Sequence, residues 1–272
     1  MYEFDRSAPV TVALRAHGGA VEVLAEERDT VVVEVTPFAD TDQARDVAAK
    51  TRVLLEDDTL LIQAPGSEYW AWRRSAKLRI VAKVPIGSVL AGKSSAADVR
   101  VAGVWSAVRL DASSADIDVA EVTGDADLDT ASGTVTVHRV GGSLRAKSSS
   151  GDVRVGDVIG DANLETASGD IRLRRGENSV RAYTASGDVE VGELRQGRAQ
   201  LKSSSGDIEV GVAAGTGVWM DLDTSSGKSV SDLTASGPTP PPTGATLELR
   251  VKTASGDIHV RRVPVRANRT AA

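Results

Sequence analysis

The segment Ser148-Ser149-Ser150-Gly151-Asp152-Val153-Arg154-Val155 decides the fold, because its first five residues return along the chain with small changes. Copies lie at 130–133 (TASG), 166–170 (TASGD), 184–188 (TASGD), 203–207 (SSSGD), 224–227 (TSSG) and 253–257 (TASGD). Two earlier copies carry Ala97 and Ala115 in place of the glycine. Positions 97, 115, 133, 151, 169 and 187 are each 18 residues apart, and a fixed period of this length indicates a repeat architecture.

Stacking the copies aligns apolar residues in columns. One column reads Leu128, Ala146, Leu164, Ala182 and Leu201, and another reads Ala126, Leu144, Ala162, Val180 and Ala199. A polar column between them reads Arg109, Asp127, Arg145, Asn163 and Arg181. Alternation with a period of two is the pattern of strands with one face inward. We therefore predict an all-β fold, a single-chain parallel β-helix (β-solenoid) with an 18-residue coil and about nine coils over residues 89–262.

The turn residues and the hydroxyl residues have predicted roles within each coil. We expect an inward hydroxyl ladder that bonds along the stack, because buried hydroxyl groups need partners: Thr130, Ser148, Thr166, Thr184 and Ser203. We expect positive φ at the turn glycines Gly133, Gly151, Gly169, Gly187 and Gly206. The opposite turn has Gly124, Gly142 and Gly160, followed by Asn178, which tolerates the same left-handed conformation.

The two ends of the chain lack the repeat. Residues 1–88 predict a β-rich capping segment with one short helix from Asp40 to about Val53, where Asp40 and Gln43 have capping-box spacing. Such a cap would cover the bare strand edge at the end of a solenoid. Residues 263–272 predict a basic tail, and residues 237–244, which are rich in proline, predict a loop pushed out of one coil.

Composition limits the classes of partner. The net charge of −6 disfavours nucleic acid, which requires a basic surface. The chain has no cysteine, which excludes disulfides and thiolate metal sites. No signal peptide or stretch of membrane-spanning length is visible. We expect a cytoplasmic protein without an integral membrane segment, or a surface protein if a leader was removed.

The repeat also carries a resemblance. The run (Thr/Ser)-(Ala/Ser)-Ser-Gly-Asp-(Val/Ile)-x-(Val/Leu), preceded by a β-rich segment and the step Val84-Pro85, resembles a bacterial family of "putative adhesins" of unknown function. This resemblance covers nearly the whole chain and implies a single-chain parallel β-helix, with no catalytic residues to carry over. The chain departs from the repeat at Ala97, Ala115, Thr134 and Lys228. A more distant likeness, in coil length and small-residue content, is to the polymerising bactofilins.

The best candidate for a metal site is the column of aspartates after the turn glycines, including Asp152, Asp170, Asp188 and Asp207. Stacked carboxylates could hold calcium, but capping of backbone amides is the favoured interpretation. The three histidines, His17, His138 and His259, are too scattered for a catalytic set. We therefore expect no enzyme activity, no catalytic residues and no cofactor or metal.

An aromatic and basic cluster is the candidate interface: Tyr69, Trp70, Trp72, Arg73 and Arg74. The favoured interpretation is that this tryptophan pair packs the cap onto the first coil. We expect Trp105 and Trp219 to fill wider points inside the stack.

These observations predict a non-catalytic structural or interaction protein, a scaffold that binds a protein partner or associates with itself. End-to-end assembly is one version of this prediction. One alternative is a cell-surface adhesin or glycan-binding module. Another is a carbohydrate-active enzyme that acts near residues 237–244.

Overall fold

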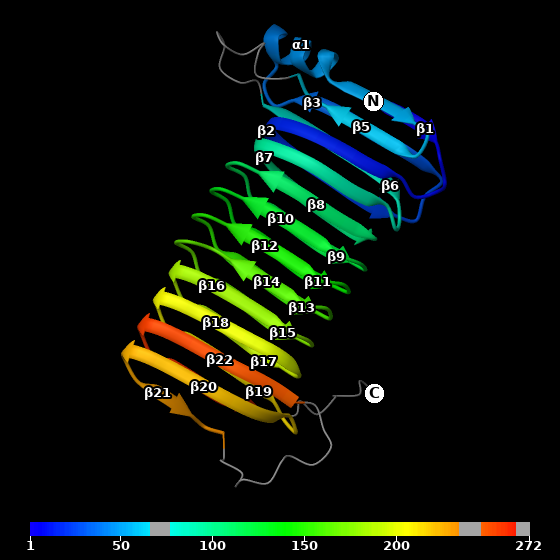
Figure 1. Ribbon diagram of the computed structural model, residues 1–272. Coiled ribbons are helices and arrows are strands. Elements are labelled where there is room, and N and C mark those ends of the chain that lie inside the picture. The colour runs from blue at the N-terminus through cyan, green and yellow to red at the C-terminus, as the bar shows by residue number, and fades with distance from the viewer. Residues whose placement is uncertain (66–76, 234–245, 265–272) are drawn as a thin grey trace, which may run out of the picture.

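A computed structural model describes residues 1–65, 77–233 and 246–264. In this part of the chain the fold is all-β apart from one helix, α1 (Asp42–Lys50), at one end of an elongated stack of coils (Figure 1). No helix among these residues is long and apolar enough to cross a membrane. The predicted fold class is confirmed.

Each coil contains two strands, and equivalent strands pair in parallel to form two faces. The first face contains β8 (Ala107–Ala112), β10 (Ala126–Thr130), β12 (Leu144–Ser148), β14 (Ala162–Glu165), β16 (Val180–Ser186) and β18 (Gly197–Ser205). The second face contains β9 (Ile117–Val122), β11 (Val135–Val140), β13 (Val153–Val158), β15 (Ile171–Gly176), β17 (Val189–Leu194) and β19 (Ile208–Ala213). The strand β7 (Val89–Trp105) runs through both faces.

The predicted columns exist and form the core. Leu128 pairs with Ala146, and Ala146 pairs with Leu164, in adjacent strands of the first face. All three are fully buried. In the neighbouring column, a small residue stands beside each large one. Ala162 lies two residues before Leu164, and Leu144 lies two residues before Ala146. Each coil thus contributes one large and one small side chain here, which keeps the narrow interior filled at constant volume.

The predicted inward hydroxyl ladder is confirmed, and its acceptor is now known. Ser148 Oγ donates to the carbonyl oxygen of Gly133 at 3.0 Å, and Thr184 Oγ1 donates to that of Gly169 at 3.0 Å. Each hydroxyl group therefore bonds to the turn of the preceding coil. The pattern satisfies a buried donor in every coil and joins adjacent turns.

The prediction of positive φ at the turn glycines is wrong for Gly133, Gly151, Gly169 and Gly187, and Gly206 has a φ of 159°, close to extended backbone. Close stacking is the physical reason for glycine. A Cβ atom on Gly151 would lie 1.9 Å from the carbonyl oxygen of Gly133 in the coil before it. The opposite turn follows the same rule, and neither its glycines nor Asn178 have positive φ.

The capping segment continues the stack across residues 88 and 89. The strand β2 (Thr11–Glu26) pairs in parallel with β7, and on its other side with β5 (Thr59–Gln63) and β6 (Leu78–Pro85). Antiparallel strands then end both faces: β4 (Arg52–Glu56) on β5, and β3 (Thr30–Pro37) with β1 (Tyr2–Asp5) on β6. The helix is shorter than predicted, and its N-cap is Thr41, whose hydroxyl group accepts from the amide of Ala44.

At the opposite end the order of the coils differs from their order in the sequence. The coil of β22 (Thr246–Ser255) and β23 (Ile258–Val263) lies between β18–β19 and the outermost coil, which is β20 (Gly217–Ser226) and β21 (Ser229–Ser231) (Figure 1). The cap shows the same inversion, because β2 lies inside β5 and β6. The first and the last coil in the sequence therefore both have a neighbour on each side.

Candidate outer binding surface of the first face

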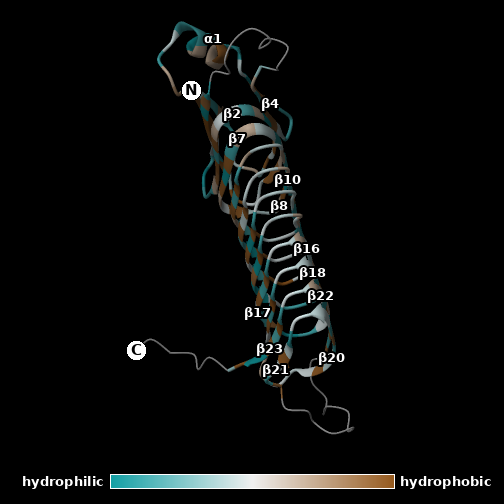
Figure 2. Cartoon of the chain, turned by 90° about the vertical axis from the view of Figure 1, so that its left-hand side faces the viewer, coloured by the Kyte–Doolittle hydropathy of each residue, from teal (hydrophilic) through white to brown (hydrophobic). Residues whose placement is uncertain are grey.

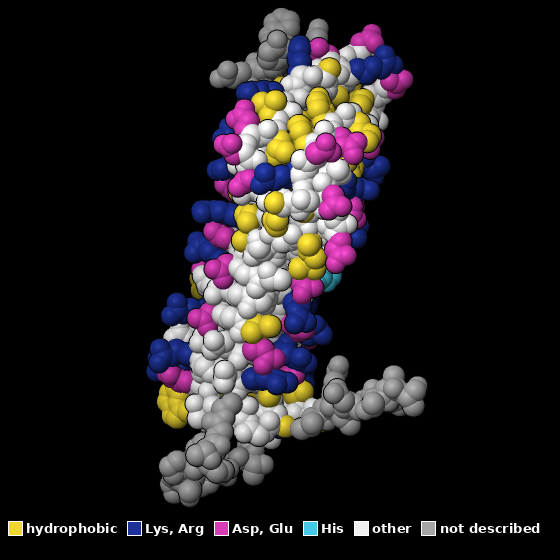
Figure 3. Space-filling view, turned by 90° about the vertical axis from the view of Figure 1, so that its right-hand side faces the viewer, with side chains coloured by type: hydrophobic (Ala, Val, Ile, Leu, Met, Phe, Trp, Pro, Cys, Tyr) yellow, Lys and Arg dark blue, Asp and Glu magenta, His cyan; other side chains and the backbone are white. Residues whose placement is uncertain are grey.

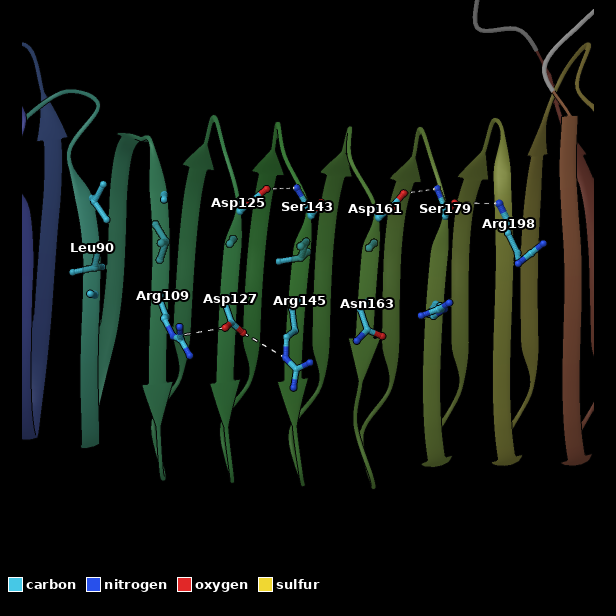
Figure 4. A pocket seen from close by; sticks show the side chains of 18 residues that line it. Leu90, Arg109, Asp125, Asp127, Ser143, Arg145, Asp161, Asn163, Ser179 and Arg198 are labelled. Carbon is cyan, nitrogen blue, oxygen red and sulfur yellow. Dashed lines mark hydrogen bonds and ion pairs between the residues drawn. The ribbon is translucent and has the colours of Figure 1, made fainter.

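A groove of about 750 Å³ runs along the outer surface of the first face, from β7 to β18. Its lining combines a row that contains Asp125, Ser143, Asp161 and Ser179 with a row that contains Arg109, Asp127, Arg145, Asn163 and Arg181. The strands hold these side chains in register at the ~4.8 Å spacing of adjacent strands, so both rows run straight along the stack (Figure 4).

The first row serves the structure of the turns. Asp125 Oδ1 accepts from the amide of Ser143 at 2.8 Å, and Asp161 Oδ1 accepts from the amide of Ser179 at 3.2 Å (Figure 4). These contacts join one coil to the next, and they use the carboxylates that point toward the groove.

The second row carries alternating charge. Asp127 lies between Arg109 and Arg145, at 3.7 Å and 3.6 Å from their Nε atoms (Figure 4). Exposed pairs of this kind contribute little stability each, about 0–1 kcal/mol. Their regular arrangement aligns long side chains along the groove wall. Elsewhere on the molecule, charges of both signs follow the borders of the stack (Figure 3).

A third row, further along the same strands, also contains pairs of opposite charge. Lys93 pairs with Asp111 at 3.0 Å, and Lys147 forms a close pair with Glu165. Partial burial raises the pKa of Glu165, but the hydrogen bond and charge of Lys147 outweigh this effect, so the pKa lies below its ordinary value. Glu165 also accepts from Asn163 Nδ2 at 3.3 Å, which orients that amide at the groove.

The alternation of charge in the second row ends at the neutral Asn163 on β14. Arg181 pairs in register with Asn163 on one side and Gln200 on the other, and both are neutral. Tyr183 lies two residues further along β16 and points to the same outer surface as Arg181. Its large side chain is 47% exposed. Tyr183 pairs in register with Lys202. Its other register neighbour is Glu165, which pairs with Lys147. Among the described residues, neither Arg181 nor Lys202 has an acidic partner within ion-pair distance, so two unpaired cations lie beside an exposed aromatic ring.

Comparison with known proteins places this architecture in a family. The model of the Toastrack DUF4097 family matches residues 12–261, which is nearly the whole chain and includes both faces. The chain belongs to the Toastrack DUF4097 family. The function of this family is unknown. The predicted resemblance to a family of unknown function is therefore confirmed. No curated protein matches the Toastrack chain.

Three solved structures are similar to the Toastrack chain in outline. A "putative adhesin" from Bacteroides fragilis is 13% identical, with a TM-score of 0.48 and coverage of 96% of this chain and 95% of the other. A "putative lipid binding protein" from Parabacteroides distasonis is 13% identical, with a TM-score of 0.46 and coverage of 97% and 96%. A "putative cell adhesion protein" from Clostridium sporogenes is 9% identical, with a TM-score of 0.24 and coverage of 95% and 94%. The likeness to bactofilins stays a prediction.

The aspartate column of this Toastrack chain serves its backbone. Asp152 Oδ1 accepts from the amide of Asp170, and Asp170 Oδ1 accepts from that of Asp188, each at 3.0 Å. Asp188 and Asp207 accept in the same way from Asp207 and Asp257. Among residues 1–65, 77–233 and 246–264, no group of three or more His, Asp and Glu could hold a metal ion. The contacts are the amide capping that the sequence favours, extended from one coil to the next.

The other predicted sites have different outcomes. The cluster Tyr69, Trp70, Trp72, Arg73 and Arg74 lies outside the described residues of the Toastrack chain, as does the loop 237–244. Trp105 is buried as predicted, whereas the prediction for Trp219 is wrong, because this side chain is 55% exposed beneath the guanidinium group of Arg250 at 5.6 Å. The histidines lie apart, His138 beside Asp118 and His259 beside Asp232.

Sequence reasoning missed the surface around Arg181 and Tyr183, although its signal was present. The polar column alternates Arg109, Asp127 and Arg145 and then reaches the neutral Asn163. A break in an otherwise regular charge pattern is visible only once the outward side of each strand is known.

Proposed function

We propose that this protein is a non-catalytic binding scaffold, whose partner contacts the outer surface of the first face. The observation that carries the proposal is the unbalanced charge of Arg181 and Lys202 beside the exposed ring of Tyr183. Hydrogen bonds and ion pairs between coils hold the neighbouring groove wall in place, and a preformed surface loses little conformational entropy on binding.

End-to-end assembly receives less support. In most coils an aspartate after the turn accepts the amide of the next coil, but the outermost coil has Lys228 at this position. A lysine has no acceptor oxygen, and an exposed lysine is a common way of protecting a strand edge. We propose a monomer in solution, and a rise in mass with concentration in light scattering would contradict it.

The proposed function is tested by chemical footprinting with limited lysine acetylation. Lys202 and Lys252 lie in one row on the outer surface of the first face, whereas Lys83 and Lys228 lie elsewhere and are also exposed. The probes are an acidic polysaccharide, a neutral polysaccharide, a basic polypeptide and vesicles that contain anionic lipid. We expect at least one probe to slow the acetylation of Lys202 and Lys252 alone and to be recovered uncut. Protection by no probe, or cleavage of a probe, would contradict the proposal.

If the partner is another protein of the same cell, we propose the cytoplasmic location that the sequence predicts. A glycan partner would instead place the protein at the cell surface. Fractionation of the producing cells, with an antibody against the chain, separates these two forms of the proposal.

A further inference from the structure

On the outer surface of the first face, most charged side chains face an opposite charge on a neighbouring strand. The pairs Arg198–Glu248 and Lys252–Asp223 continue this rule beyond β18, at 2.8 Å and 2.6 Å. The outer surface of the second face follows it too, because Arg174 pairs with Asp157 at 2.6 Å and Arg172 pairs with Glu190 at 3.6 Å. An exposed cation without such a partner is therefore a departure from the local pattern.

Arg181 and Lys202 depart from it together. Arg181 lies across from Gln200, and Lys202 is two residues beyond Gln200 on the same side of β18. Parallel strands lie ~4.8 Å apart and rise ~3.3 Å per residue, so diagonal neighbours of this kind lie about 8 Å apart, within reach of two long side chains converging on one anion. A carboxylate between them would receive charge-assisted hydrogen bonds from both, and guanidinium groups favour a bidentate contact with a carboxylate.

Tyr183 adds an apolar surface beside these cations. It stands two residues from Arg181 on the same side of β16 and directly across from Lys202. Its ring combines apolar carbon with a hydroxyl group that can donate or accept. Asn163 and Gln200 add neutral amide groups on the two strands next to β16. This set of groups fits a ligand that has a negative charge, an apolar ring face and several hydroxyl groups.

We propose that this surface binds an acidic glycan, with the carboxylate of one sugar between Arg181 and Lys202 and its ring against Tyr183. The groove from β7 to β18 reaches Arg181 and gives the rest of an extended glycan a place beside small side chains. The inference deepens the proposed function and rests on it.

Other occupants and positions fit less well. A nucleic acid places a phosphate at every nucleotide, and the same surface presents Asp127, Asp221 and Asp223, which would repel it. Arg15, near the cap, also has no acidic partner among the described residues, but its register neighbours are Gln63 and Lys93, without an exposed aromatic ring. Charge and aromatic surface also coincide at Arg250 and Trp219, but Arg250 pairs with Glu248 at 2.8 Å. At Arg181 and Tyr183 they coincide without an acidic partner for the arginine.

The test is isothermal titration of the full chain with three acidic probes, each with a neutral counterpart of the same length. The probes are a tetragalacturonate, a glucuronate-containing tetrasaccharide and a sialylated trisaccharide. We expect saturable binding of at least one acidic probe and at least tenfold weaker binding of its neutral counterpart. Binding of no acidic probe, equal binding of a neutral counterpart, or tighter binding of a single-stranded oligonucleotide would overturn the proposal.

Variants tie the binding to the site. Arg181→Ala should weaken it about tenfold or more, because a hydrogen bond to a charged group is lost. Tyr183→Ala should weaken it several-fold and Tyr183→Phe much less, whereas Arg139→Ala on the second face should leave it unchanged. Equal effects of Arg181→Ala and Arg139→Ala would also overturn the proposal. The two proposals can fail separately. If no acidic glycan binds but another probe protects Lys202 and Lys252 in the footprinting experiment, the acidic glycan is excluded and the binding scaffold is retained.

Discussion

The amide of Lys228 donates to Oδ1 of Asp257 at 2.8 Å, although Asp257 comes 29 residues later in the chain. In the preceding coils the amide belongs to the later residue, as between Asp207 and Asp188. The reversal shows that the last coil in the sequence has been inserted beneath the coil before it. The strands β20 and β21 consequently lie at the edge of the stack, with β22 and β23 as their partners.

This order of coils predicts the pattern of hydrogen exchange. Strands β22 and β23 are paired on both sides, so their amides should exchange more slowly than those of β20 and β21. Exchange followed by mass spectrometry with peptides from 217–231 and 246–263 measures both. Slower exchange in 217–231 would show that the coils stack in chain order.

The alternation of large and small side chains in the core predicts two different costs. Leu164→Ala should lower the free energy of unfolding by about 2–5 kcal/mol, because Leu164 is fully buried and its register neighbours Ala146 and Ala182 cannot fill the cavity. Ala146→Leu should lower it by about 1–3 kcal/mol through overpacking between Leu128 and Leu164. Denaturant unfolding measures both changes. A neutral effect of either substitution would contradict the alternating core.

The aspartate column predicts that an acceptor oxygen matters more than a negative charge. Asp170→Ala should cost about 1–2 kcal/mol, because the amide of Asp188 loses its acceptor, whereas Asp170→Asn keeps an oxygen and should cost less. Thermal unfolding in calcium and in chelator should give the same midpoint, since Oδ1 is already occupied by an amide. A midpoint that calcium raises in wild type and not in Asp170→Ala would favour a metal site.

The lowered pKa of Glu165 predicts a contribution to stability that depends on pH. A carboxylate whose pKa is lower in the folded than in the unfolded chain stabilises the fold above the unfolded pKa, and this contribution is lost as the pH falls through the folded pKa. The difference in unfolding free energy between wild type and Glu165→Gln should be constant above about pH 6 and shrink below 4.5. In a Lys147→Met background this dependence should weaken. A difference that grows in acid would contradict the pairing.

The sequence contains the repeat but not the arrangement of its copies at the ends. Regular spacing and like residues predicted that Leu128, Ala146 and Leu164 would align, because each strand turns the same positions inward, as the alternating hydropathy of the strands shows (Figure 2). The inversion could not be predicted, because coils with equivalent residues can exchange places without changing any column. The position of Trp219 has a different cause: it is in register with the outward Glu248, whereas Met220 is in register with the buried Leu249.

The turns and the cap show two further limits. The sequence predicts positive φ for Gly151, but its role is to allow the close approach of Gly133, which depends on the distance between coils. The strand β2 joins the parallel stack without carrying the repeated phrase, because backbone pairing with β7 requires no particular sequence. The polar column in the sequence contains Arg181. The sequence does not show that Tyr183 and Lys202 share one outer surface with it.

The most direct test of the account is a double-mutant cycle between Arg181 and Gln200, which are register neighbours. Gln200→Glu would place an acid across from Arg181 and extend the alternation of charge seen from Arg109 to Arg145. Unfolding free energies of wild type, Gln200→Glu, Arg181→Met and the double variant give the coupling. We predict a favourable coupling of about 0.2–1 kcal/mol. A coupling of zero, or an unfavourable one, would show that Arg181 is not the open cation, able to accept an acidic partner, on which the proposed binding surface depends.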